Sequence, residues 1–338
     1  MPSDRTAPEF PLDSHFMSEP IIAGAPSHKP LLRRWLSFVV MGGVLIAWVW
    51  FLKSQLLLLS AHSWQVVPIW LAISIPIATL YFIGLGSSWA VLLRSMSATP
   101  NAVTVFQGAR IWQLSMFSRY IPGNIWHVLS RALLAEQIPA PRSLVIASAT
   151  IEQLITLLGA LLVVPLALPQ LGSRVLGMTG VPVTVIIITT LAAGLLLVHP
   201  QLLGRLFNLI GARLRRPEIA WNYTYRSMIG LLSLYAMTTI IAGFSLVAIV
   251  VGLGSFEIAH IPFIIGSAAL AWIIGYMSIV TPSGLGVREG VLASLLALIL
   301  PLPIAVAASL LFRISSTIGE SLALVILWIA GRRASSRR

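Results

Sequence analysis

Arginine and glutamate side chains occur inside stretches of this sequence that are otherwise apolar. The residues concerned are Arg131, Glu152, Arg288, Glu289, Arg313 and Glu320. A charged side chain at the centre of a bilayer costs about 2.5–3.5 kcal/mol even on permissive insertion scales, so such residues should be paired or should line a polar path. Guanidinium groups bind phosphate well. These residue types therefore predict recognition of an anionic group, with the carboxylates balancing the arginines when the site is empty.

The first polar cluster follows a break in the backbone at Pro122 and Gly123. Asn124 can cap a new helix, and His127 and Arg131 follow it at helical spacing, so all three share one face. A helix start inside the membrane offers free N–H groups and a partial positive charge, which suit a phosphate. The alternative is a simple loop cap with Arg131 extending to the surface, and with His127 as a packing residue.

The second break is the segment Thr-Pro-Ser-Gly-Leu-Gly, which contains Pro282, Gly284 and Gly286. Irregular backbone at membrane depth is tolerated only inside protein or beside a wet cavity, and transporters place broken helices at their substrate sites. Glu289 is favourable in the first turn of the following helix, whereas Arg288 opposes the helix dipole. Arg288 is therefore a candidate for ligand binding or gating. Both breaks precede an arginine and then an apolar run with an acid, which suggests two related halves.

Each charged residue should have a partner on another helix. Glu152 should be either protonated or paired with an arginine; the pair would be structural, or the site would couple protons or act as a gate. Arg313 and Glu320 lie about 10 Å apart along one helix, too far for contact. Glu152 and Glu289 are the candidate partners of Arg313, and Arg288 or Arg131 could serve Glu320.

Composition decides which elements carry these residues. Hydrophobic residues make up 57% of the 338 residues and charged ones only 9%, which excludes a soluble globular enzyme. Apolar runs long enough to cross a bilayer occur at about 36–58, 66–93, 143–168, 181–199, 227–251, 260–280 and 305–330. We expect 101–138 to cross an even number of times, as a re-entrant hairpin or a short pair of helices, and 287–300 to cross once. The fold class is all-α and polytopic, with about eight transmembrane helices, a re-entrant hairpin and broken helices.

The ends of the chain and its basic residues set the expected organisation. Residues 1–30 read as a disordered tail, 31–331 as the transmembrane domain and 332–338 as a basic cytoplasmic tail. Arginines flank the apolar runs mainly on one side, which places both termini in the cytoplasm and the protein in the cytoplasmic (inner) membrane. The net charge of +12 therefore indicates loop charge beside anionic lipid, not nucleic-acid binding.

Several kinds of chemistry have no support in the sequence. There is no cysteine, no HExxH, no GxSxG and no phosphate-binding glycine loop. The scattered histidines do not form a metal-ligand pattern. We expect no catalytic residues, no metal and no cofactor, and hence no enzymatic activity.

Two motif pairs resemble a known family. They are IPGNIWHVLSRALLAEQIPAP followed by SATIEQLITLLGALL, and TPSGLGVREGVLASLL followed by AASLLFRISSTIGE. They resemble the membrane region of the lysylphosphatidylglycerol synthases, a flippase-like domain family, over roughly 35–330. The resemblance implies a helical membrane fold with re-entrant elements that moves a phospholipid or a lipid-linked head group. It points to Pro122, Gly123, Arg131, Glu152, Pro282, Gly284, Gly286, Arg288, Glu289 and Arg313.

The same resemblance shows one difference from the full synthases, which carry a soluble aminoacyl-transferase domain after the membrane region. This chain ends at Arg338, so we do not expect it to make lysylphosphatidylglycerol alone. The favoured hypothesis is a translocase for an anionic phospholipid or polyprenyl-linked lipid. The alternatives are an accessory subunit of a glycosyltransferase or envelope-lipid synthase, which would partner that enzyme without transport, and a membrane-embedded transferase or phosphatase.

Overall fold

The computed structural model describes residues 66–335, with gaps at 98, 100–101, 121–125, 176, 178, 198, 200, 203–204, 206–223, 255–256 and 279–281. All of these residues belong to one compact unit. The expected tail at 1–30, the expected span at 36–58 and most of the basic C-terminal tail lie outside the described residues.

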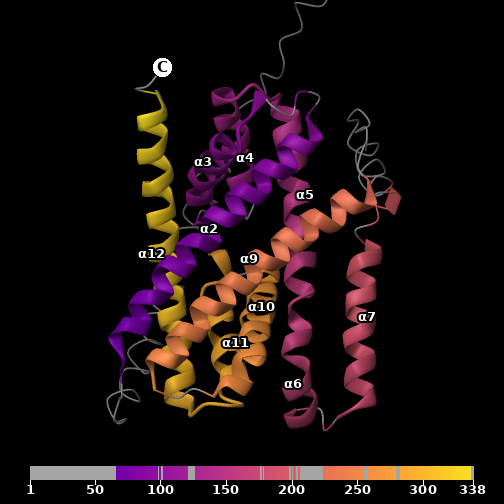
Figure 1. Ribbon diagram of the computed structural model, residues 1–338, viewed down its shortest axis with the longest axis vertical. Helices are drawn as coiled ribbons and strands as arrows, with labels where there is room; N and C mark the ends of the chain where they lie inside the picture. The colour runs from indigo at the N-terminus through magenta and orange to yellow at the C-terminus, as the bar shows by residue number, and fades with distance from the viewer. Residues whose placement is uncertain are drawn as a thin grey trace, which may run out of the picture. The chain divides into compact units, whose positions relative to one another are not determined.

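The described part of the chain is helical and contains no strand, which confirms the all-α fold class (Figure 1). The helices are α2 (Pro68–Met96), α3 (Val105–Met116), α4 (Trp126–Leu134), α5 (Arg142–Leu161), α6 (Leu168–Arg174), α7 (Val181–Leu197), α9 (Tyr225–Gly252), α10 (Ile261–Met277), α11 (Val287–Leu296) and α12 (Leu302–Ser335). Short 3-10 turns include η3 (Phe117–Tyr120), η5 (Val164–Leu166) and η7 (Pro282–Gly284).

Five segments among the described residues are long and apolar enough to cross a membrane. They are Pro68–Met96, Arg142–Leu166, Tyr225–Gly252, Ile258–Met277 and Leu302–Arg332. An α-helix satisfies its own backbone hydrogen bonds, which is why apolar sequences of this length form helices in lipid. The protein is therefore a multi-pass membrane protein, as the composition predicts.

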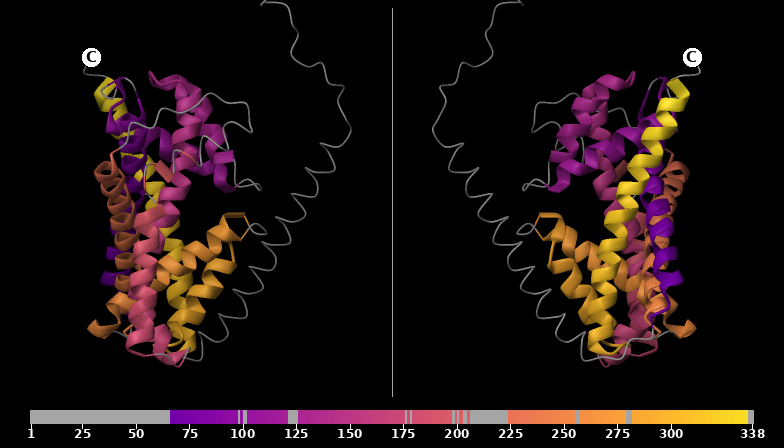
Figure 2. Two further views of the ribbon diagram at one scale, coloured as in Figure 1. Left: turned by 90° about the vertical axis from the view of Figure 1, so that its right-hand side faces the viewer. Right: turned by 90° about the vertical axis from the view of Figure 1, so that its left-hand side faces the viewer.

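The mixed segment 101–138 folds as a helical hairpin. Its helices α3 and α4 have 12 and 9 residues, or about 18 and 14 Å, so neither crosses a 30 Å hydrocarbon core. The pair enters where α2 ends and α5 begins, and it returns to the same end (Figure 2). The expectation of a re-entrant hairpin or a short pair of helices is confirmed.

A second hairpin, formed by α10 and α11, was not foreseen. Helix α11 has 10 residues, or about 15 Å, so the expectation that 287–300 crosses once is wrong. The chain reverses because Ser283, Gly284 and Gly286 adopt positive φ angles of 54°, 67° and 83°. A Cβ on Gly284 would lie 2.6 Å from the carbonyl oxygen of Gly275, so only glycine allows this close return.

The two hairpins belong to two halves of the same order. In each half a long helix precedes a hairpin and another long helix follows it: α2, α3–α4, α5, and then α9, α10–α11, α12. Helices α2 and α9 pack antiparallel, and the Val67 N–H donates to the carbonyl of Gly252 at 2.7 Å. The halves are therefore inverted, the hairpins enter from opposite ends, and η3 contacts η7 where they meet (Figure 2). This arrangement agrees with the suggestion of two related halves.

Arginines gather at one end of the helices. Arg94 at the end of α2, Arg142 at the start of α5, Arg226 at the start of α9 and Arg332 near the end of α12 lie toward the end marked C (Figure 1). Arg174, at the end of α6, lies at the opposite end. The arginine-rich end therefore coincides with the entry of the α3–α4 hairpin.

Candidate functional site

A cavity lies where the two hairpins meet. It holds about 1040 Å³ of empty space, including its open mouth. Its walls come from the middle of α2 (Tyr81, Phe82, Leu85), the first hairpin (Trp112, Met116, Arg119, His127), the middle of α5 (Glu152, Gln153, Thr156), the second hairpin (Trp272, Gly275, Tyr276, Ser278, Ser283, Gly284, Arg288) and α12 (Arg313, Ser316, Thr317). Since α2 and α5 contribute residues from their midpoints, the cavity lies halfway along these helices.

Arg288 is the cavity arginine that has no carboxylate partner among the described residues. Its guanidinium lies over the ring of Phe312, with Cζ 5.1 Å from the ring centre. No described glutamate or aspartate lies within ion-pair distance of it. Arg288 therefore faces the cavity without a carboxylate at ion-pair distance among the described residues, and its role in ligand binding or gating stays a prediction.

Arg313 pairs with Glu289, one of its two candidate partners. The Arg313 Nη1 and Glu289 Oε1 atoms are 3.6 Å apart, and both side chains are largely buried. The other Glu289 oxygen, Oε2, accepts from the Gly286 N–H at 2.7 Å and so caps α11. Glu289 therefore stabilises the start of α11 and also ties this helix to α12.

Arg119 is the cavity arginine that we did not select from the sequence. It stands in η3, and its Nη2 donates to Glu320 Oε2 of α12 at 2.5 Å. The expectation that Arg288 or Arg131 would serve Glu320 is therefore wrong. Arg119 lies three residues before Pro122 of the first backbone break. A charged residue so close to a break was the sequence signal that could have identified it.

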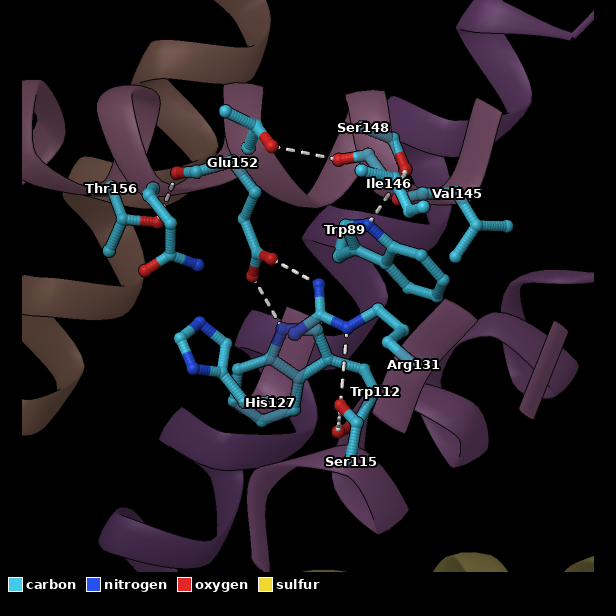
Figure 3. A network of polar contacts seen from close by, with 12 residues as sticks. Trp89, Trp112, Ser115, His127, Arg131, Val145, Ile146, Ser148, Glu152 and Thr156 are labelled. Atoms are coloured by element: carbon cyan, nitrogen blue, oxygen red, sulfur yellow. Dashed lines mark hydrogen bonds and ion pairs between the residues drawn. The ribbon is translucent and has the colours of Figure 1, made fainter. Parts of the chain in front are cut away.

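Arg131 and Glu152 form a buried ion pair between α4 and α5 (Figure 3). Arg131 is fully buried; its Nε donates to Ser115 Oγ at 3.1 Å, and its guanidinium lies over Trp89 at 4.6 Å. Trp112 Nε1 also donates to Glu152. The two charges therefore face each other and have further polar neighbours, although Arg131 Nη2 has no hydrogen-bond partner among the described residues. Polar neighbours of this kind help to keep an ion pair in an apolar interior.

This pair changes the expected composition of the site. Glu152 and Trp112 line the cavity, whereas Arg131, which bonds to Glu152 and is fully buried, does not. The hypothesis that Arg131 lines the cavity together with Arg288 and Arg313 is wrong, and Arg119 occupies that role. Of the two alternatives for Glu152, pairing with an arginine is the observed one.

The remaining site residues fall partly outside the described chain. Pro122, Gly123 and Asn124 belong to a gap, so the proposed cap at Asn124 is untested. The backbone of Pro282 lies in η7, beside Gly284. His127 lines the cavity and is buried, and its Nδ1 has no hydrogen-bond partner among the described residues. No group of three or more metal-ligating side chains occurs in the described part of the chain.

The comparison with protein families settles the family. The model of the lysylphosphatidylglycerol synthase TM region matches residues 34–323. The chain belongs to this family. The match covers both hairpins and the whole cavity, and it confirms the resemblance seen in the two motif pairs. No curated protein and no solved structure matches the chain.

Membership in the lysylphosphatidylglycerol synthase TM-region family indicates a lipid-related function in a membrane. The arrangement can do three things chemically. It can bind an anion through Arg288, exchange anions at Arg119 and Arg313, and offer aromatic faces and hydroxyl groups beside them. The residues that provide these three capacities lie about halfway along the membrane-spanning helices.

Proposed function

We propose that the protein is a lipid translocase that moves an anionic phospholipid or polyprenyl-linked lipid across the cytoplasmic membrane. The observation that carries this proposal is the convergence of Arg119, Arg288 and Arg313 in one cavity between two opposed hairpins. A phosphate head group would occupy the cavity while its acyl chains remain in lipid. Arg288, which lacks a carboxylate partner among the described residues, supplies the first contact.

Charge balance supports exchange of partners during transport. In the structure Glu289 pairs with Arg313 and Glu320 pairs with Arg119, so both arginines are neutralised without a ligand. A phosphate can replace either carboxylate at its arginine, because both are oxygen anions that accept from guanidinium. Differential binding of the head group to the two states would then shift the protein between them.

The orientation follows from the positive-inside tendency. The end with Arg94, Arg142, Arg226 and Arg332 would face the cytoplasm, and the end with Arg174 would face away from it. The C-terminus then lies in the cytoplasm, and a single crossing at 36–58 would put the N-terminus there as well. In this proposal the protein has no catalytic residue and no nucleic-acid partner.

One observation favours a second candidate, an accessory subunit of a glycosyltransferase or envelope-lipid synthase. Two of the three cavity arginines already have carboxylate partners, and such pairs can be purely structural. The double change Glu289→Arg with Arg313→Glu separates the candidates. Full recovery of function in the double variant would indicate a structural pair, whereas a cavity that binds phosphate would keep the defect.

The direct test is translocation of a fluorescent anionic phospholipid in proteoliposomes. We expect Arg288→Ala and Arg313→Ala to lower the rate at least tenfold, since each removes a positive charge from the cavity. Arg226→Ala is the matched control, because Arg226 is an exposed arginine outside the cavity. Wild-type rates in both folded cavity variants would refute the translocase proposal.

A further inference from the structure

Each hairpin lies between α5 and α12, and the two hairpins enter this space from opposite ends of the molecule. The first arm of each hairpin packs on the last helix of the opposite half: α3 on α12, and α10 on α5. The second arm packs on the last helix of its own half: α4 on α5, and α11 on α12. The two hairpins therefore fill the space between α5 and α12 above and below the cavity.

The second arms are fixed by buried ion pairs. Arg131 of α4 pairs with Glu152 of α5, and Glu289 of α11 pairs with Arg313 of α12. In both halves the ion pair joins the second arm of the hairpin to the long helix that follows it, but the arginine and the glutamate have exchanged elements. In each half the returning arm is thus joined to its own long helix by charges that are costly to separate unless another ion takes the partner's place.

At the cavity, a polar side chain of each hairpin reaches the opposite half. In the first hairpin, Arg119 donates to Glu320 of α12. In the second hairpin, the Tyr276 hydroxyl donates to Gln153 Oε1 of α5 at 2.9 Å. All of these residues except Glu320 line the cavity. Each contact joins a hairpin to the last helix of the opposite half, Arg119 to α12 and Tyr276 to α5.

The buried neighbours of these contacts show where each arm is held more firmly. Gln113 Nε2 donates to the carbonyl of Glu320 at 2.9 Å, farther from the tip of the first hairpin. In the second hairpin, a Cβ on Gly266 would lie 2.5 Å from the backbone nitrogen of Ala167, so α10 is in close contact with the chain after η5. The first arm is tightly packed nearer its base, where a Cβ on Gly108 would lie 2.5 Å from the Ala90 Cβ of α2. Helix α10 is likewise tightly packed toward its base, and the cavity end of each hairpin is joined to the opposite half by side-chain contacts.

From this geometry we infer that two described contacts, Arg119–Glu320 and Tyr276–Gln153, are the two gates of the cavity. Arg119–Glu320 closes the arginine-rich end, and Tyr276–Gln153 closes the opposite end. This inference rests on the proposed function only for the identity of the cargo, because access to the cavity can be measured without any lipid substrate. Inverted repeats with alternating access around a central site are a recurrent transporter design.

The gates differ in their chemistry, and that difference has a consequence. Arg119–Glu320 is ionic, so an anion in the cavity can compete with Glu320 for the guanidinium. Tyr276–Gln153 is a neutral hydrogen bond, which an anion does not neutralise. An anionic head group would therefore loosen the gate at the arginine-rich end and leave the other gate unchanged.

The natural absence of cysteine makes the gates directly testable. Ser316→Cys places one thiol in the cavity wall with little change in volume. Vesicles of known orientation are treated with a membrane-impermeant maleimide on one side at a time. In this background we compare Glu320→Gln, which removes the ionic contact, with Tyr276→Phe, which removes the hydroxyl. Thr150→Val is the control, because the Thr150 hydroxyl bonds only within α5, away from the cavity.

We expect Glu320→Gln to raise labelling several-fold from the arginine-rich end only, and Tyr276→Phe to raise it several-fold from the opposite end only. If Glu320→Gln does not fold, the exchange Arg119→Glu with Glu320→Arg should fold and keep wild-type labelling. Gate opening on the same side by both variants, or unchanged labelling in both folded variants, would overturn the inference. If the two variants open opposite ends as expected but the wild type transports no lipid, the proposed function would be refuted and the inference about the gates would remain supported.

Discussion

Arg131 and Glu152 are 21 residues apart in sequence and form an ion pair that is buried on every side. The pair joins the first hairpin to α5 (Figure 3), and its Glu152 lines the cavity whereas Arg131 does not. Because the two charges face each other and also bond Ser115 and Trp112, with Arg131 Nη2 left without a hydrogen-bond partner among the described residues, we assign the pair to stability and not to ligand binding.

Removing one partner should therefore destabilise the protein strongly. Arg131→Met leaves the Glu152 charge buried without its cation, which typically costs about 3–5 kcal/mol. Thermal unfolding in detergent should show a large fall in Tm for Arg131→Met and a smaller fall for Arg131→Met with Glu152→Gln. Wild-type Tm in the single variant would show that the pair is not structural.

Gly284 should tolerate no side chain. Its φ is +67°, and an added Cβ would lie 2.6 Å from the Gly275 carbonyl oxygen, so Gly284→Ala should disrupt the second hairpin. Gly290→Ala is the matched control within α11, because nothing lies within 4 Å of the added Cβ and alanine favours a helix by about 1 kcal/mol. We expect Tm to fall in the first variant and to rise slightly in the second. Equal Tm values would contradict this account of the turn.

Glu289 has two separable roles. Glu289→Gln keeps an oxygen that can accept from the Gly286 N–H but loses the charge opposite Arg313. Glu289→Ala loses both, and loss of a helix cap costs about 1 kcal/mol more. Unfolding should therefore rank wild type above Glu289→Gln, and Glu289→Gln above Glu289→Ala. A Gln variant no more stable than the Ala variant would exclude the capping role.

Local signals in the sequence predicted most of the described helices, the second break and part of the charge pairing. Glu289 could be named as a partner of Arg313 because an unpaired charge in an apolar helix is costly wherever it lies. The partner of Glu320 could not be found in this way, because Arg119 is 201 residues away and reaches it only through the inverted arrangement of the halves. That arrangement is a property of tertiary packing.

The length of 287–300 was misjudged for a similar reason. Its composition is apolar enough for a span, but Gly284 and Gly286 reverse the chain and leave only 10 residues in α11. The burial of Arg131 against Glu152 also could not be predicted from the sequence. Helical spacing shows which face of a helix a residue occupies, but not which other element packs against that face. Only the structure shows that Arg131 is fully buried outside the cavity lining, whereas Arg119, Arg288 and Arg313 line the cavity.

The central claim is that the cavity arginines bind an anionic lipid head group, and the most direct measurement is the lipid that copurifies with the protein. Native mass spectrometry of the wild type should show a bound anionic phospholipid or lipid-linked phosphate. Its occupancy should fall at least tenfold in Arg288→Gln and remain at the wild-type level in the exposed-arginine control Arg226→Gln. Equal occupancy in the wild type and Arg288→Gln, or binding of uncharged lipids alone, would contradict the claim.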